Sequence, residues 1–210
     1  MHTSKFAAGF FVGILVAASL SAAEPPILDK IKSKLNRAQT IKAEFDLQIY
    51  WAVREKTENK SGLFWLGPGD KFRVELGASL WVSNGTTYWQ YNQNSNQVII
   101  KNLLDVDLSL HPSQILKNYL HDHSYAVEKD GSQQMVVTSV PGAGDTQSQI
   151  QKISIRIDKK EAMLDKILIT DTKGNTSTYS FKKLKTGISI PRERFSFEPP
   201  SDANILDTRD

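Results

Sequence analysis

The sequence predicts a mainly β protein: a single unclosed antiparallel β-barrel with an N-terminal amphipathic helix and a helical lid. Three observations predict this fold. Apolar and polar residues alternate over about eleven short segments, turn signals separate these segments, and the strands follow one another without the strand-helix-strand rhythm of a parallel sheet. One helical pattern interrupts the run of strands, and another precedes it.

The chain starts with the features of a secretory signal peptide. Lys5 supplies a positive charge, an apolar stretch covers residues 6–18, and Ser21-Ala22-Ala23 fits a small-residue cleavage site. The apolar stretch is shorter than the roughly 20 residues that a helix needs to span a bilayer. We expect residues 1–23 to be removed, leaving a soluble exported domain over residues 24–210. An uncleaved anchor or a short buried helix is the alternative.

An amphipathic helix is expected directly after the signal peptide. Behind Pro25-Pro26, apolar residues recur at helical spacing from Ile27 to Ala38, and the pattern ends near residues 39–40. The period then changes to two from Ile41 to Val53, which predicts one long strand with an apolar face. Such a strand would reach about 40 Å, so we expect it to bend around a curved sheet.

The remaining strands are shorter, and a second helix lies between them. We expect the strands at residues 61–66, 71–76, 79–83, 86–91, 97–101, 125–129, 135–140, 151–158, 164–170 and 176–184. Asn84-Gly85 and Lys173-Gly174-Asn175 mark hairpin turns. Pro112 suits the first turn of a helix whose apolar stripe includes Leu116 and Leu120.

The composition excludes several classes of protein. The chain has no cysteine, which excludes disulfides, a thiol nucleophile, cysteine-bound zinc and lipidation at an N-terminal cysteine. The formal net charge of +3 is too balanced to indicate a nucleic-acid partner. The core therefore depends on hydrophobic burial alone.

No motif supports catalysis or a cofactor. Gly67-Pro68-Gly69 and Gly142-Ala143-Gly144 lack the further residues of phosphate-binding loops and are interpreted as turns. His121, Asp122 and His123 form a lone cluster that fits a polar helix end better than a metal site. We therefore expect a protein that is not an enzyme and has neither a metal nor a cofactor.

Large apolar residues gather on the predicted strands and near the C-terminus. They are Phe64, Trp65, Phe72, Trp81, Trp89, Tyr91, Phe181, Phe195 and Phe197. In a generic β protein such residues fill the core. A barrel of about eleven strands, however, encloses more volume than side chains easily fill, and unfilled apolar volume favours an apolar ligand. The residues alone leave both interpretations open.

Three ordered motifs resemble those of the LolA-type lipoprotein carriers. Residues 61–65 (Ser-Gly-Leu-Phe-Trp), with Pro68 and Phe72, resemble a Gly-x-Leu-Trp…Pro…Phe segment of that family. Residues 83–92 resemble its Ser-Asp-Gly hairpin and Trp-x-Tyr-Asn strand, and residues 195–200 resemble its Phe-x-Phe-x-Pro-Pro ending. The likeness covers essentially all of the expected mature chain.

The resemblance implies a periplasmic carrier that performs no covalent chemistry. We expect a monomer, although the sequence does not determine the oligomeric state. Its expected partners are acylated lipoproteins, an inner-membrane ABC transporter that releases them, and an outer-membrane receptor that accepts them. Two alternatives stay open: a carrier of another lipid, and an envelope-stress sensor that binds lipoproteins.

We expect apolar residues of the strands and of the second helix to form an acyl-chain cavity and its lid. They are Trp65, Phe72, Val74, Trp81, Trp89, Leu116, Leu120, Ile167 and Ile169. By resemblance, Phe72, Leu116 and Ile167 fall at cavity or lid positions of the family. One departure concerns the lid, because Gly67 stands where the family often has an arginine. Arg73 is no simple substitute, since it should point away from the cavity if Phe72 points into it.

Overall fold

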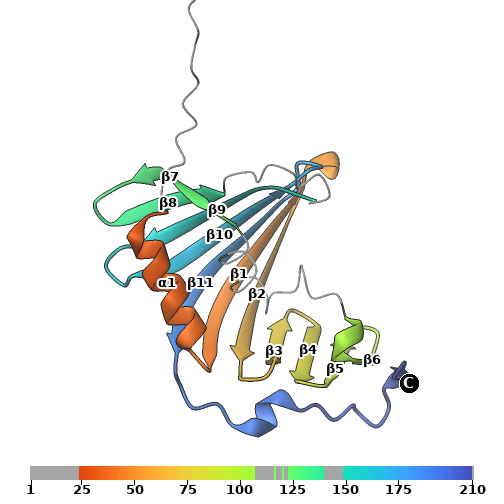
Figure 1. Cartoon of the computed structure of the whole chain (residues 1–210). Coiled ribbons are helices and arrows are strands. Elements are labelled where there is room, and N and C mark those ends of the chain that lie inside the picture. Colours follow the sequence, from red (N-terminus) through yellow and green to blue (C-terminus); the bar gives the residue numbers. More distant parts are fainter. Residues whose placement is uncertain (1–23, 107–115, 117–119, 121–122, 140–148, 210) are drawn as a thin grey trace, which may run out of the picture.

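A computed structural model describes residues 24–106, 116, 120, 123–139 and 149–209. Within this part of the chain, one complete α-helix accompanies a single sheet of twelve strands (Figure 1). The elements are α1 (Pro26–Arg37), β1 (Ile41–Trp51), β2 (Lys56–Leu66), β3 (Lys71–Leu76), β4 (Ser79–Asn84), β5 (Thr87–Asn92), β6 (Gln97–Asn102), β7 (Tyr125–Asp130), β8 (Gln134–Ser139), β9 (Ile150–Asp158), β10 (Met163–Asp171), β11 (Thr176–Thr186) and β12 (Asn204–Asp207).

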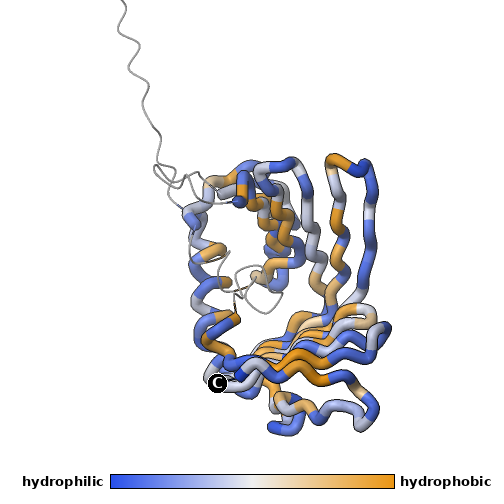
Figure 2. Tube along the Cα trace, turned by 90° about the vertical axis from the view of Figure 1, so that its right-hand side faces the viewer, coloured by the Kyte–Doolittle hydropathy of each residue, from blue (hydrophilic) through white to orange (hydrophobic). Residues whose placement is uncertain are grey.

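The sheet is strongly curved and unclosed (Figures 1 and 2). Its strand order is β12-β6-β5-β4-β3-β2-β1-β11-β10-β9-β8-β7, so β12 and β7 form the two outer edges of the described sheet. Neighbouring strands are antiparallel except β12, which pairs in parallel with β6. The predicted open antiparallel barrel is confirmed, and β12 is the strand that the sequence did not indicate.

The predicted long first strand is confirmed, but it ends earlier than the predicted Val53. β1 stops at Trp51, where a 3-10 helix (Ala52–Arg54) turns the chain into β2. β2 begins at Lys56, well before the predicted residue 61, because its polar first half pairs with β1 along its whole length. β3 pairs only with the second half of β2, from Gly62 to Leu66.

The helix α1 lies against the concave side of the sheet (Figures 1 and 2). Leu28, Ile31 and Leu35 form its apolar stripe and are buried there. Asp29 in the first turn suits the positive end of the helix dipole. The helix ends at Arg37, slightly before the predicted residues 39–40.

The second predicted helix lies mostly outside the described residues. Leu116 and Leu120 are described, and both have helical backbone conformation and buried side chains. Both belong to the same hydrophobic cluster as the stripe of α1. The predicted turn at Gly142-Ala143-Gly144 also lies outside the described residues.

Two separate apolar layers stabilise the sheet, one on each face. The concave layer joins α1, Leu116 and Leu120 to alternate residues of β1–β3 and β7–β11, with Tyr88 of β5. The convex layer lies on β2–β6 and contains Trp65, Val82 and Ile100, which are buried but do not belong to the concave cluster. The C-terminal segment covers this second layer, where Phe195 is buried and the ring of Phe197 lies 5.5 Å from that of Tyr91.

Candidate functional site

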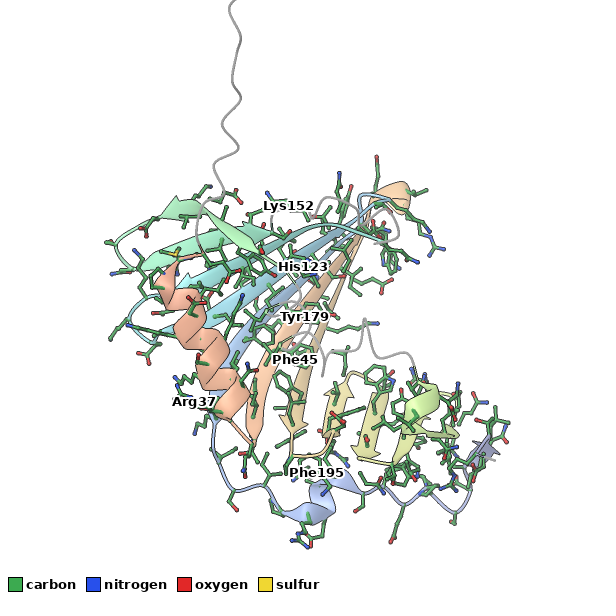
Figure 3. All side chains as sticks on the ribbon, viewed as in Figure 1. Arg37, Phe45, His123, Lys152, Tyr179 and Phe195 are labelled. Atoms are coloured by element: carbon green, nitrogen blue, oxygen red, sulfur yellow. The ribbon has the colours of Figure 1, made fainter. Side chains whose placement is uncertain are left out.

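An aromatic cluster occupies the middle of the concave face. It consists of Phe45, Phe64, Tyr179 and Phe181 on three neighbouring strands. The ring centroids of Phe45 lie 5.9 Å from Phe64 and 6.2 Å from Tyr179, and Phe64 meets Phe181 edge to face at 6.1 Å. Figure 3 shows Phe45 and Tyr179 projecting into the interior, while Phe195 lies on the opposite side of the sheet.

Strand register explains why these rings meet. Phe45 is directly opposite Phe181 in the β1–β11 pair, and Leu47 is opposite Tyr179. Gly62 is opposite Phe45 in β2, and a Cβ atom at Gly62 would lie only 2.8 Å from the Phe45 ring. The missing side chain therefore lets that ring lie across β2.

Seven of the nine predicted site residues share the concave layer. Register aligns Phe64 with Val74 and Val74 with Trp81, and it aligns Leu66 with Phe72, so all of these side chains point to the concave face. Ile167 is opposite Tyr179, and Ile169 points the same way. Leu116 and Leu120 complete the set.

The structure does not bring Trp65 and Trp89 to that face. Register aligns Trp65 with Arg73, Arg73 with Val82 and Val82 with Trp89, which places both tryptophans on the convex face. There the guanidinium carbon of Arg194 lies 4.8 Å from the centroid of the Trp65 ring. Within the structure, Trp65 belongs to the convex layer and is separated from the concave face by the sheet.

Two pockets open at opposite ends of the concave face. The tip pocket, of about 270 Å³, is lined by Ile49, Trp51, Gln149, Ile150, Ile169, Asp171, Asn175, Ser177 and Tyr179. The helix pocket, of about 290 Å³, is lined by Leu35, Asn36, Ala38, Gln39, Ile41, Leu66, Gly67, Pro68, Gly69, Asp70 and Leu116. The aromatic cluster lies between them along β1. A larger hollow of about 590 Å³ involves Glu44, Asp46, Glu75 and Lys182, and these charges make it unsuitable for an acyl chain.

Sequence reasoning missed Phe45 and Tyr179 as site residues. The signal for Phe45 was present, because it occupies the apolar parity of the long alternating strand from Ile41. Tyr179 carries a weaker signal, since Thr, Ser and Lys surround it on β11.

A hydrogen bond and an ion pair of Glu24 hold the start of α1 next to β7. The carboxylate of Glu24 accepts a hydrogen bond from the backbone N–H of Tyr125 (3.0 Å) and lies 2.7 Å from the ammonium of Lys32. The Lys32 ammonium also lies 5.8 Å from the centroid of the Tyr125 ring. This contact fixes the start of α1 at the edge of the concave face.

The glycine at position 67, where an arginine was expected, has a steric explanation. A Cβ atom at Gly67 would lie 2.8 Å from the Phe195 ring, so a side chain at this position requires that ring to move. Arg73 points to the convex face, as expected, where its Nε lies 2.7 Å from a carboxylate oxygen of Glu75. Arg73 therefore does not reach the concave face to replace the family arginine.

Few ionisable groups enter the apolar interior. Burial raises the pKa of the Tyr88 phenol well above its ordinary value, so this group stays neutral. Ser83 is buried, and its hydroxyl accepts a hydrogen bond from the backbone N–H of Gly85. Among the residues that the structure describes, no three His, Cys, Asp or Glu side chains are grouped to bind a metal. His121 and Asp122 of the predicted polar cluster lie outside those residues.

The fold and the site define a class of protein: an open β-barrel whose apolar concave face is covered by helical residues. Residues 36–198 match the family model described as "Outer membrane lipoprotein carrier protein LolA". This match covers more than half of the chain, which therefore belongs to the LolA family.

Individual relatives agree with this assignment. An outer-membrane lipoprotein carrier protein from Chromobacterium violaceum is 27% identical over 199 residues, covering 91% of this chain and 93% of the relative. A protein of the same name from Neisseria meningitidis is 27% identical over 194 residues, covering 90% of each chain. An uncharacterized conserved protein from Thermus thermophilus has a similar fold, with a TM-score of 0.54 and 15% identity, covering 87% of this chain and 97% of that protein.

In the described part of this chain, none of the helical structure has the length and apolarity needed to cross a bilayer.

Proposed function

We propose that the chain carries lipoproteins across the periplasm by enclosing their acyl chains between the concave face and the helical residues that cover it. The concave apolar layer is the observation that carries this proposal. Clients would come from an inner-membrane ABC transporter and leave to an outer-membrane receptor. The names of the curated relatives support this direction of transport.

The energetics require nearly complete burial of the cargo. An acyl chain of about fifteen methylenes gains on the order of 12 kcal/mol on leaving water. A carrier that left half of the chain exposed would lose about half of that gain. The apolar walls around Phe45 and Ile167 provide the required surroundings on the concave face.

The two pockets are too small to accept such cargo without rearrangement. Each is below the range of about 300–1,000 Å³ that is usual for ligand sites. Leu116 and Leu120 are fully buried against the concave layer, and Leu116 also lines the helix pocket. In the proposed mechanism, loading displaces these two side chains and replaces their contacts with acyl contacts.

Release uses the same exchange in reverse. When the cargo leaves, Leu116 and Leu120 return to the concave layer, and their reburial offsets part of the cost of exposing the interior. The carrier therefore needs no covalent step and no bound energy source. The free energy of handover comes from the receiving protein or membrane.

Binding of a fluorescent triacylated lipopeptide tests the cavity. Leu116→Asp is expected to weaken binding by about tenfold or more, because in the proposed loaded state the displaced residue 116 covers the acyl chain, and a carboxylate there replaces an apolar contact. Leu104→Asp is the matched control, since Leu104 is 98% exposed and carries the same chemical change. Phe72→Glu tests the wall of the cavity independently of the covering residues.

Circular dichroism and urea unfolding establish that each variant remains folded. Folded Leu116→Asp and Phe72→Glu proteins that bind the lipopeptide as tightly as wild type would contradict the cavity assignment. Mass spectrometry of material copurified from envelope extract identifies the cargo. Acylated proteins support the proposal, free lipid alone supports a carrier of another lipid, and a signalling protein alone supports a sensor.

A further inference from the structure

The tip of the β1–β2 hairpin exposes apolar side chains. Seven large apolar residues are well exposed in the described part of the chain, and three of them, Tyr50, Trp51 and Val53, lie at this tip. Val53 is 88% exposed and Trp51 is 36% exposed. The turn between β10 and β11 lies beside this tip (Figure 1). We call residues 50–56 and 171–175 together the loading tip.

Hydrogen bonds hold the loading tip in a defined shape. The side-chain oxygen of Asn175 accepts a hydrogen bond from the backbone N–H of Ala52 (3.0 Å), and its amide nitrogen donates to Asp171 (2.8 Å). Asp171 also accepts hydrogen bonds from the backbone N–H groups of Lys173 and Asn175. These hydrogen bonds stabilise the turn that carries Val53. They also direct the carboxylate of Asp171 into the β10–β11 turn.

The outward charges of the loading tip are mainly positive. Arg54, Lys56 and Lys173 are exposed, and Glu55 is the exposed acid between them. Lys56 lies 3.6 Å from Glu58, whereas the described residues provide no ion pair for Arg54 or Lys173. Exposed apolar groups flanked by basic residues and aromatic rings suit the headgroup region of an anionic membrane.

The loading tip adjoins the apolar interior. Trp51 and Asn175 belong to the loading tip and also line the tip pocket. The pocket continues past Ile49 to Tyr179 of the aromatic cluster. A surface that touches the loading tip therefore lies next to an entrance of the proposed cavity.

We propose that the loading tip docks on an anionic lipid surface, with Val53 in the headgroup boundary and Arg54 and Lys173 beside lipid phosphates. Its dimensions favour a membrane over a protein, because a specific protein interface usually involves about 20–30 residues on each side. The tip comprises only two adjacent turns. Transient docking is the expected mode, since a few exposed apolar side chains and a few cations give weak and salt-sensitive attachment. The purpose of this docking, though not its chemistry, rests on the proposed function.

Vesicle cosedimentation with the full-length mature chain tests the proposal. Wild type should bind vesicles made of equal parts phosphatidylglycerol and phosphatidylcholine, and binding should fall with added salt or with phosphatidylcholine alone. Val53→Asp and the pair Arg54→Gln/Lys173→Gln should each reduce binding by about fivefold or more. Leu104→Asp is the control and should bind as wild type, because Leu104 is exposed elsewhere on the molecule.

Lipopeptide binding in vesicle-free solution separates this proposal from the proposed function. The loading-tip variants should retain lipopeptide affinity, since Val53, Arg54 and Lys173 do not line the tip pocket. Wild-type binding to neither vesicle, or undiminished binding by both loading-tip variants, would overturn the docking proposal. Attachment of wild type to a purified unacylated protein partner through Val53, without vesicle binding, would also overturn it. If the wild-type protein did not bind the lipopeptide, that result would overturn the proposed function and leave the docking proposal standing.

Discussion

Phe45→Ala tests whether the aromatic cluster closes the interior of the unloaded protein. Phe45 is 1% exposed, and its ring contacts the aromatic residues Phe64 and Tyr179 between the two pockets. Truncation of a buried phenylalanine typically lowers the free energy of unfolding by about 3–5 kcal/mol. The same truncation should connect the tip pocket to the helix pocket, because the ring lies between them along β1.

The ligand dependence of stability distinguishes this role from ordinary core packing. A ligand at one hundred times its Kd stabilises a protein by about 2.7 kcal/mol, and each tenfold gain in affinity adds about 1.4 kcal/mol. Phe45→Ala should therefore gain more stability from the lipopeptide than wild type does. Urea unfolding with and without lipopeptide measures both free energies.

The matched control is Phe197→Ala on the convex face. Phe197 packs against Tyr91 and is only partly buried, so its truncation should cost less and leave the ligand increment unchanged. An equal or smaller ligand increment for Phe45→Ala than for wild type would refute the idea that its ring separates the pockets. A cost below about 1 kcal/mol would refute its assignment to the packed core.

Three further predictions concern other parts of the molecule. Gly67→Arg should lower the unfolding free energy by about 1–3 kcal/mol in urea denaturation, because the new side chain must displace the Phe195 ring; unchanged stability would contradict this. Glu24→Gln should cost about 1–2 kcal/mol by weakening the contact with the α1 lysine, and should increase amide exchange at the start of β7. In wild type the Arg209 guanidinium lowers the Asp207 pKa to about 2, so the stabilising effect is present above the unfolded pKa near 3.8 and disappears as pH falls through about 2. Arg209→Gln should return this pKa towards its ordinary value in an NMR titration.

The sequence predicted the strands whose own residues alternate clearly. The strand from Lys71 to Leu76 has the predicted bounds, since a buried residue at every second position defines both its extent and its faces. The first half of β2 was missed because Lys56, Glu58 and Lys60 give no apolar signal, and only pairing with β1 makes this segment a strand. β12 was missed for a different reason: its four residues are too few to show alternation, its two apolar residues are adjacent, and only pairing with β6 makes this segment a strand.

The site was predicted less completely because β2–β6 have apolar residues on both faces. Alternation states that Phe64 and Trp65 point in opposite directions, but it does not state which direction faces the interior. That choice depends on the C-terminal segment, which brings Phe195 to the Trp65 side of the sheet. Long-range packing of this kind cannot be inferred from the spacing of apolar residues within one strand.

The second apolar layer has a physical consequence for the proposed exchange of contacts on the concave face. A sheet with a single apolar face loses much of its packing when that face releases its contacts. Here the convex layer, with Trp65, Val82 and Ile100, keeps β2–β6 packed against the C-terminal segment regardless of what covers Phe72 and Val74 on the other face. Gly67 is part of this arrangement, because its missing side chain admits the Phe195 ring beside the helix pocket. Gly67, where the resemblance led us to expect an arginine, thus contributes to the packing of the convex face, and apolar contacts such as those of Leu116 cover the concave face.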